Sequence, residues 1–302
     1  MNNQIEEIKA NLAKKKYICD DVLASAIYVA LKLNRPLLIE GAAGVGKTEV
    51  AKAMSKVLGR ELVRLQCHYG IDETRAVYEW NYQKQLLAIQ AYSTPNREDG
   101  DEIMQSIFSW DFLLERPLLY SIKSENPVVL LIDELDKTDE EFEAFLLELL
   151  AEYQVTIPEL GTFQAKSMPF TVLTSNNTRP LSDALRRRCI YAYVDYPSVE
   201  RELEIIKVRF PEADELLSEE VALTVAHLRS NLRILKKPSI SETLDWIAAL
   251  EAMDAHRLDR ASVESTINSV LKNHDDIEEA LQDPELLPQD RAEAAAAEQS
   301  VL

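Results

Sequence analysis

The apolar residues in the first two thirds of the chain gather in short continuous runs that end at turn-forming or charged residues. These runs are Leu37–Ile39, Leu62–Leu65, Val128–Ile132, Phe170–Leu173 and Ile190–Val194. A continuous run, unlike one that alternates apolar and polar residues, is typical of a strand buried on both faces. The pattern therefore predicts an α/β fold with a parallel sheet covered by helices.

Helical periodicity separates these runs. Thr48–Leu58 is one predicted helix, and Glu140–Tyr153 is another, because its large apolar residues recur at i, i+3, i+4, i+7, i+8 and i+11. An earlier helix is predicted to end near Asn34. The segment Gln154–Ala165 is interpreted as a hairpin, with a plain surface connection as the alternative.

Beyond Pro197 the strand pattern stops, and the remaining periodicity is helical. Helices are predicted over Val221–Leu228, Ser241–Met253 and Ala261–Lys272. Ser239, followed three residues later by Glu242, is a candidate capping box. We therefore expect an α/β domain over residues 1–197, a smaller all-α domain over 198–282 and a disordered tail over 283–302.

Composition and charge narrow the classes of function. Hydrophobic residues make up 46% of the 302 residues and charged residues 28%, which is typical of a globular protein. The net charge of −19 disfavours nucleic acid as a partner. The three cysteines are far apart and odd in number, so a reducing compartment is favoured. With no secretory leader and no apolar run long enough for a membrane span, a cytoplasmic location is expected.

Three of the seven glycines fall within six residues, and this concentration indicates a nucleotide site. The segment reads Gly41-Ala42-Ala43-Gly44-Val45-Gly46-Lys47-Thr48, between a predicted strand and a predicted helix, as a phosphate-binding P-loop requires. Its backbone would bind the phosphates of ATP, Lys47 would reach the β- and γ-phosphates, and Thr48 would ligate Mg²⁺. The alternative is an ordinary glycine-rich turn with a solvated lysine.

Two adjacent carboxylates follow the apolar run at 128–132. Asp133 is placed to hold Mg²⁺, and Glu134 is placed to act as the general base on the attacking water. Four histidines show no metal-ligand spacing and are interpreted as structural or solvated.

Polar residues also follow the run at 170–173. Asn176 is a candidate to orient water or the γ-phosphate, and a turn formed by Asn176 and Asn177 is the alternative. Three consecutive arginines then precede the last strand, and Arg188 or Arg187 is a candidate arginine finger for a neighbouring subunit's nucleotide. Charges that complement a helix C-terminus are the alternative role for them.

Together, the P-loop, the Leu-Leu-Ile-Asp-Glu segment, Thr-Ser-Asn and Ala-Leu-Arg-Arg-Arg-Cys resemble an AAA+ ATPase. Within that superfamily the chain resembles the MoxR group, and its CoxD-like branch in particular. Further similar stretches are Arg64–Cys67, Val77–Tyr82, Glu148–Gly161 and Ser241–Trp246.

The resemblance implies a five-stranded parallel sheet sandwiched by helices, a helical lid and hexameric rings with ATP and Mg²⁺ between subunits. By motif position, Asn176 matches the sensor 1 residue and Arg188 the finger. A sensor 2 arginine has no counterpart in the lid, where Lys237 is the candidate for this contact. The resemblance also implies a chaperone-like remodeller of a protein client, beside a von Willebrand factor A domain partner. For the CoxD-like branch, it implies assistance in metal-centre maturation of a molybdenum hydroxylase.

Two other classes of function stay open. A nucleotide-gated binding scaffold would hold ATP with little turnover. The presence of Glu134, a candidate general base, beside Asp133 disfavours this class. A DNA-acting AAA+ loader is disfavoured by the net charge of −19.

The aromatic residues Tyr78, Trp80 and Tyr82 alternate with polar residues, which predicts an extended segment with one aromatic face. This face either packs against the core or contacts a client or partner.

Overall fold

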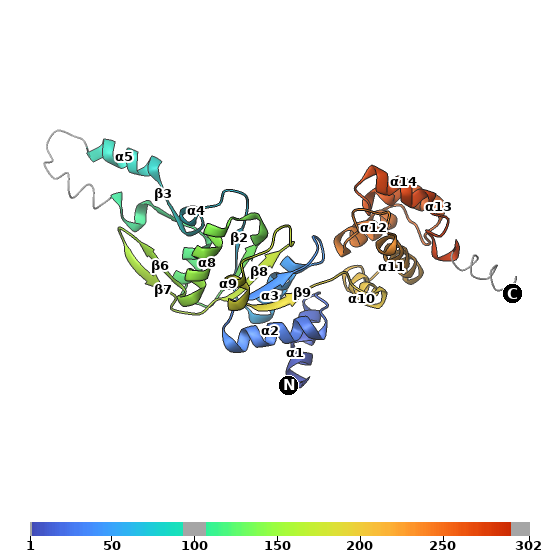
Figure 1. Cartoon of the computed structure of the whole chain (residues 1–302), viewed down its shortest axis with the longest axis horizontal. Helices are drawn as coiled ribbons and strands as arrows, with labels where there is room; N and C mark the ends of the chain where they lie inside the picture. Colours follow the sequence, from blue (N-terminus) through green and yellow to red (C-terminus); the bar gives the residue numbers. More distant parts are fainter. Residues whose placement is uncertain (1, 93–106, 291–302) are drawn as a thin grey trace. The chain divides into compact units, whose positions relative to one another are not determined.

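The computed structural model describes residues 2–92 and 107–290 of the chain. One part of it is built on a five-stranded parallel sheet with the strand order β2-β5-β8-β1-β9 (Figure 1). Its strands are β1 (Leu37–Glu40), β2 (Leu62–Gln66), β5 (Val129–Asp133), β8 (Phe170–Ser175) and β9 (Ile190–Tyr193). Each predicted apolar run is a strand of this sheet, so the predicted α/β fold is confirmed.

Burial differs between the centre and the edge of the sheet. The three central strands β5, β8 and β1 are buried at every position. Strand β2 lies at an edge, where Val63 and Leu65 are buried while Arg64 and Gln66 are exposed. One face of β2 therefore presents polar side chains next to β5.

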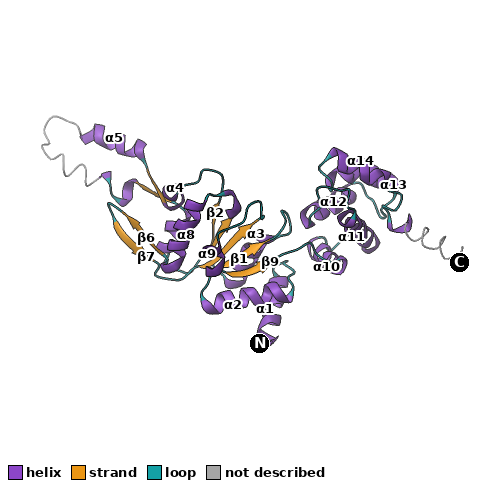
Figure 2. Cartoon of the chain, in the orientation of Figure 1, coloured by secondary structure: helices purple, strands orange, loops and turns teal. Residues whose placement is uncertain are grey.

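Helices surround the sheet (Figure 2). Those of this part are α2 (Asp21–Leu33), α3 (Lys47–Leu58), α4 (Glu73–Val77), α5 (Tyr82–Tyr92), α7 (Pro117–Lys123), α8 (Glu140–Glu152) and α9 (Asp183–Arg188), with 3-10 turns η1 (Trp110–Phe112) and η2 (Leu135–Lys137). Helix α2 begins after Asp20, whose carboxylate accepts from the backbone N–H of Leu23 at 2.7 Å, and ends at Asn34 in the left-handed conformation. It packs against β1 and β9.

Two small antiparallel pairs accompany the main sheet. Strands β6 (Gln154–Ile157) and β7 (Gly161–Gln164) form the hairpin predicted over 154–165. Strand β3 (Tyr78–Trp80) pairs with β4 (Leu113–Glu115). The predicted extended aromatic segment is confirmed for β3, but it is wrong for Tyr82, which begins α5.

The chain divides into two compact units. One consists of the residues before Lys9, Asp20–Glu40 and Thr48–Tyr193, and contains the sheet. The other consists of Lys9–Cys19, Gly41–Lys47 and the chain from Val194 onward. The second unit thus includes the glycine-rich loop and part of the N-terminal helix α1 (Asn2–Lys14), which two consecutive domains would not include.

The second unit is helical after Val194, as the sequence predicted. Its helices are α10 (Val199–Arg209), α11 (Glu215–Ser230), α12 (Ile240–Ala252), α13 (Arg260–Thr266), the 3-10 turn η3 (Ile267–Ser269) and α14 (His274–Gln282). They surround the fully buried Trp246, and the predicted capping box of Ser239 and Glu242 starts α12.

Two predictions in this unit are wrong in part. The helix predicted over Ala261–Lys272 ends at Thr266 and continues as a 3-10 turn. The predicted tail begins too early, because Leu286 and Leu287 are buried in the core of the helical unit. The other predicted tail residues, from 291 to 302, lie outside the described residues.

Candidate functional site

The loop between β1 and α3 has the backbone shape that the glycine pattern predicted. It follows Glu40, the last residue of β1, and α3 begins at Lys47. Gly44 has φ 77° and Gly46 has φ 94°, a region that residues with a Cβ rarely adopt. At Gly44 a Cβ would also lie 2.1 Å from Oγ of Ser239. The loop therefore needs glycine at Gly44 for two independent reasons.

Lys47 is buried, with only 6% of its surface exposed. Its ammonium group donates to the carbonyl oxygens of Gly41 at 2.8 Å and Ala42 at 2.6 Å. The alternative of a solvated lysine is therefore wrong. A cation held over a loop of this shape fits a phosphate group, which would take over these hydrogen bonds.

Thr48 and Asp133, the two predicted metal ligands, lie in direct contact. The Thr48 hydroxyl donates to Oδ1 of Asp133 at 3.0 Å and is 3.2 Å from Oδ2. Asp133 ends the central strand β5, is 2% exposed, and also accepts from the Thr174 hydroxyl at 2.5 Å. Carboxylate and hydroxyl oxygens are the ligands that Mg²⁺ prefers, so these residues fit that ion.

Glu134 has a strained backbone and a restrained carboxylate. Its φ of 59° is left-handed, and its N–H donates to Oγ1 of Thr174 at 2.9 Å. Its carboxylate accepts from Nε2 of Gln66 at 2.8 Å and from Nζ of Lys137 at 2.5 Å. The hydrogen bond from Lys137 and the negative charge of Glu134 raise the pKa of Lys137 above its usual value.

Sequence reasoning missed Arg64 and Gln66 of β2. Arg64 donates to Oδ2 of Asp133 through both Nε, at 3.1 Å, and Nη2, at 2.5 Å. A signal was available, since these polar residues interrupt the apolar run at alternate positions, as expected for an edge strand with one exposed face.

Asn176 follows the last residue of β8, close to the end of β5. Its backbone N–H donates to Oδ1 of the buried Asp136 at 3.0 Å, while N–H and hydroxyl of Thr178 donate to Oδ2 at 3.1 and 2.5 Å. Burial by itself would raise the pKa of Asp136, but the hydrogen bonds from Thr178 and Asn176 outweigh it and lower this pKa. Asp136, which the sequence did not single out, thus fixes the backbone at Asn176.

The turn proposed as the alternative is also present, because Asn177 has φ 57°. It does not conflict with a role for the Asn176 side chain, which stays a prediction.

The three consecutive arginines have different surroundings. Arg186 pairs with the buried Glu40 at 2.6 Å. Arg188 donates to the carbonyl oxygen of Ala151, in the last turn of α8, at 2.6 Å. Within the described residues, the exposed Arg187 side chain has no hydrogen-bond or ion-pair partner. In this structure Arg188 therefore complements the C-terminus of α8, a helix other than α9, which the three arginines end.

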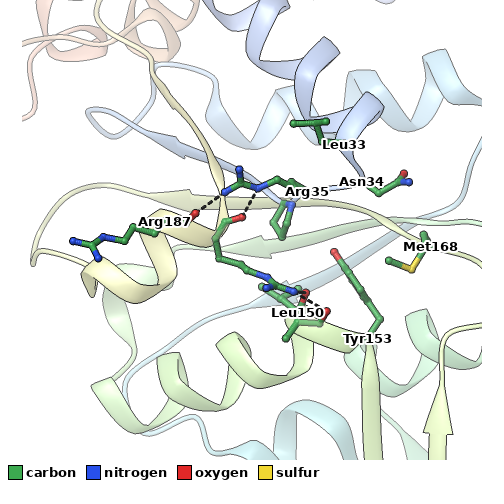
Figure 3. A pocket seen from close by; sticks show the side chains of 10 residues that line it. Leu33, Asn34, Arg35, Leu150, Tyr153, Met168 and Arg187 are labelled. Carbon is green, nitrogen blue, oxygen red and sulfur yellow. Dashed lines mark hydrogen bonds between the residues drawn. The ribbon is translucent and has the colours of Figure 1, made fainter.

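Arg187 and Arg188, together with Arg35, line a pocket of about 320 Å³. The guanidinium of Arg35 donates to the carbonyl oxygens of Arg187 at 2.5 Å and Arg188 at 2.9 Å (Figure 3). Arg35 precedes β1 and Arg188 precedes β9, so the pocket lies at the amino ends of the strands. The glycine-rich loop leaves β1 at its carboxyl end. Arg188 therefore lies at the amino ends of the strands, opposite to the end from which the glycine-rich loop leaves. It is not placed to contact a nucleotide bound at the loop of the same subunit.

In the second unit, the helical part contacts the glycine-rich loop through a serine. The N–H and hydroxyl of Ser241 donate to the carbonyl oxygen of Gly44 at 3.3 and 3.1 Å. Lys237, the weak candidate for the lid contact, donates its ammonium hydrogen to the carbonyl oxygen of Asn231 instead.

The described residues contain neither a cluster of metal-ligating side chains nor a helix fit to span a membrane. No group of three or more His, Cys, Asp and Glu side chains there could hold a metal ion. In the same residues, no helix combines the length and apolar character that crossing a membrane requires.

Comparison with known proteins places most of the sheet-containing part in one family. Residues 36–189 match the AAA domain family, dynein-related subfamily. An uncharacterised protein of Staphylococcus saprophyticus is 24% identical over 247 residues, which is 79% of this chain and 84% of that protein. An uncharacterised protein of Staphylococcus aureus is 27% identical over 226 residues, 72% of this chain and 76% of that protein.

Among solved structures, one point mutant of Thermotoga maritima RuvB has a similar fold. The match covers 90% of this chain and 72% of the RuvB chain, with 19% sequence identity and a TM-score of 0.49. For a second point mutant of the same protein, the match covers 89% of this chain and 71% of the RuvB chain, with 20% identity and a TM-score of 0.47.

Proposed function

Because the chain belongs to the dynein-related AAA domain family, we propose that it binds Mg²⁺ and ATP and hydrolyses the ATP to ADP and phosphate. The single observation that carries this proposal is the contact between Thr48 and the buried Asp133. It supports a metal-binding pair of oxygens directly after the glycine-rich loop, where the phosphates of a nucleotide would lie.

Each residue of the site has a defined part in this reaction. Lys47 and the backbone of the loop bind the phosphates, and Thr48 with Asp133 holds Mg²⁺, which neutralises phosphate charge when bound. Glu134 accepts a proton from the water whose oxygen attacks the γ-phosphorus, while the bond to the β-phosphate oxygen breaks and ADP leaves. Asn176 orients this water or the γ-phosphate.

The edge position of Arg188 supports action between subunits. In a ring, the amino ends of the strands of one subunit would face the nucleotide of the next subunit. Arg188 would then exchange its hydrogen bond to the α8 carbonyl for a contact with the γ-phosphate of that nucleotide and stabilise its charge. We propose a homo-hexamer on this basis and on the resemblance to AAA+ proteins.

At the finer level, we propose a remodelling ATPase of the MoxR group, CoxD-like branch, acting in the cytoplasm on a protein client. By the same resemblance, its partner is a von Willebrand factor A domain protein, and its client is a molybdenum hydroxylase whose metal centre it helps to mature. Genes for these two proteins beside the gene of this chain would support the partner and the client, and their absence would count against both.

A binding scaffold with little turnover is a second candidate, which one observation favours. Glu134, the proposed base, is held by both Gln66 and Lys137 in this structure. Phosphate release from ATP by the full chain, with Mg²⁺ and with EDTA, separates the two candidates. Sustained Mg²⁺-dependent turnover is expected. Tight ATP binding without turnover would establish the scaffold instead.

A further inference from the structure

A continuous chain of hydrogen bonds joins the two adjacent carboxylates of the site. From Asp133, it runs through the guanidinium of Arg64, which also donates to Oε1 of Gln66. Nε2 of Gln66 then donates to Oε2 of Glu134 at 2.8 Å. Because the oxygen of the Gln66 amide faces Arg64, its nitrogen is directed at Glu134. The position of Arg64 therefore determines which group Gln66 offers to the proposed base.

The burial of Asp133 makes this cation important. Asp133 is 2% exposed, and an isolated carboxylate in such a place is strongly disfavoured unless a cation or a metal accompanies it. Two hydroxyl groups also donate to it, but they carry no charge. Arg64 is the cation that neutralises Asp133 here, and its own side chain is 46% exposed, so it has room to move away.

We infer that Arg64 is a positioning residue that neutralises the buried Asp133 before Mg²⁺ is bound, and that the ion displaces it. The inference rests on the proposed function. Mg²⁺ and the guanidinium compete for the same carboxylate, so binding of the ion weakens the Arg64–Asp133 pair.

An arginine suits this task better than a lysine. One guanidinium donates to Asp133 through two nitrogens and to Gln66 through one of them. The fixed fork of the guanidinium makes such a bridge possible, whereas an ammonium group is a compact point charge. Loss of the bridge and loss of the charge can therefore be tested separately.

The test compares ATP dissociation constants measured with EDTA and with Mg²⁺, in the Glu134→Gln background to suppress turnover. The ratio of the first constant to the second measures how much the ion strengthens binding. In Arg64→Ala, Mg²⁺ displaces no cation, and unneutralised Asp133 repels metal-free ATP. Both effects raise the ratio, by about tenfold for one charge-assisted hydrogen bond.

Arg116→Ala is the matched control. Arg116 is 44% exposed, close to the value of Arg64, and pairs with Glu79 away from this site. In this variant we expect the ratio of the two dissociation constants to equal that of the parent protein. Arg64→Gln should raise the ratio as Arg64→Ala does, and it serves if the alanine variant does not fold. Arg64→Lys should return the ratio toward the parent value, because it restores the charge.

A parent ratio in both neutral Arg64 variants would overturn the inference and leave the proposed function intact. Failure of the parent protein to bind ATP, or binding of ATP that Mg²⁺ does not strengthen, would overturn the proposed function instead.

Discussion

Thr48, in the first turn of α3, donates its hydroxyl hydrogen to Oδ1 of Asp133, the last residue of β5, at 3.0 Å. The two residues are 85 positions apart in the sequence. Their contact exists because the glycine-rich loop leads into the first turn of α3 beside the carboxyl end of β5, although β8 separates β5 from β1 in the sheet. Both side chains are thereby available to one ion, and the following experiments examine the residues around them.

Lys47→Ala should abolish measurable ATP binding. The change removes the ammonium group held over the glycine-rich loop, where it would contact the β- and γ-phosphates. Calorimetric titration with ATP measures the effect. Lys52→Ala is the control, since Lys52 belongs to the same helix but is only half-buried and pairs with Glu49. If Lys47→Ala bound ATP as tightly as the parent protein, the assignment of residues 41–48 as a P-loop would be wrong.

Glu134→Gln should keep ATP and Mg²⁺ bound but slow hydrolysis about a hundredfold or more, the usual effect of losing a positioned base. An amide of the same shape cannot accept the proton of the attacking water. Single-turnover phosphate release, together with ATP affinity, measures both effects. Glu140→Gln, at the start of α8, should behave as the parent protein. Parent-like turnover in Glu134→Gln would place the base elsewhere.

Arg188→Ala should bind ATP normally and hydrolyse it about a hundredfold more slowly or worse, as expected for a lost arginine finger. The defect should depend on subunit mixing. With Lys47→Ala subunits, which keep their own Arg188, mixed assemblies should recover some activity. The exposed Arg187 provides the matched variant, and Arg187→Ala should remain active. Loss of activity in Arg187→Ala alone, with active Arg188→Ala, would assign the finger to Arg187.

Trp80→Ala should lower the free energy of unfolding by about 3–5 kcal/mol, the usual cost of emptying a buried aromatic site. Trp80 is 8% exposed and packs edge to face against Phe108, with ring centroids 5.2 Å apart. This favours core packing over client contact for Trp80. Urea unfolding measures the change. Tyr82→Ala is the control, because Tyr82 is 64% exposed and its loss should leave stability unchanged. A fully stable Trp80→Ala would revive the contact role.

Cys67 and Cys189 should resist alkylation by iodoacetamide at pH 8 in the folded protein. Burial, and for Cys67 also the charges of Asp133, Glu134 and Asp136, raises the pKa of each thiol to about 12. A raised pKa disfavours the reactive thiolate at every pH below it. Mass spectrometry should show both thiols modified rapidly in denaturant. Rapid modification of Cys67 without denaturant would contradict the buried position of its thiol.

The residues that sequence reasoning located correctly are those whose roles depend on near neighbours. The apolar runs are strands because burial on both faces favours apolar side chains in the middle of a sheet, although β8 also buries Thr171, Thr174 and Ser175. Gly44 and Gly46 were recognisable because a positive φ is a property of one residue and its immediate chain. The order of strand, loop and helix around Lys47 follows from the same local information.

The sequence by itself thus determined the sheet, the helical second part and the shape of the loop, together with the residue types available for binding ATP. Only the tertiary structure decided that Arg64 neutralises Asp133, that Asp136 fixes the backbone at Asn176, and that Arg188 caps α8. The physical reason is distance along the chain. Each of these contacts joins residues tens of positions apart, and a hydrogen bond or charge pair between distant residues leaves no periodic pattern in the sequence that would reveal the partner.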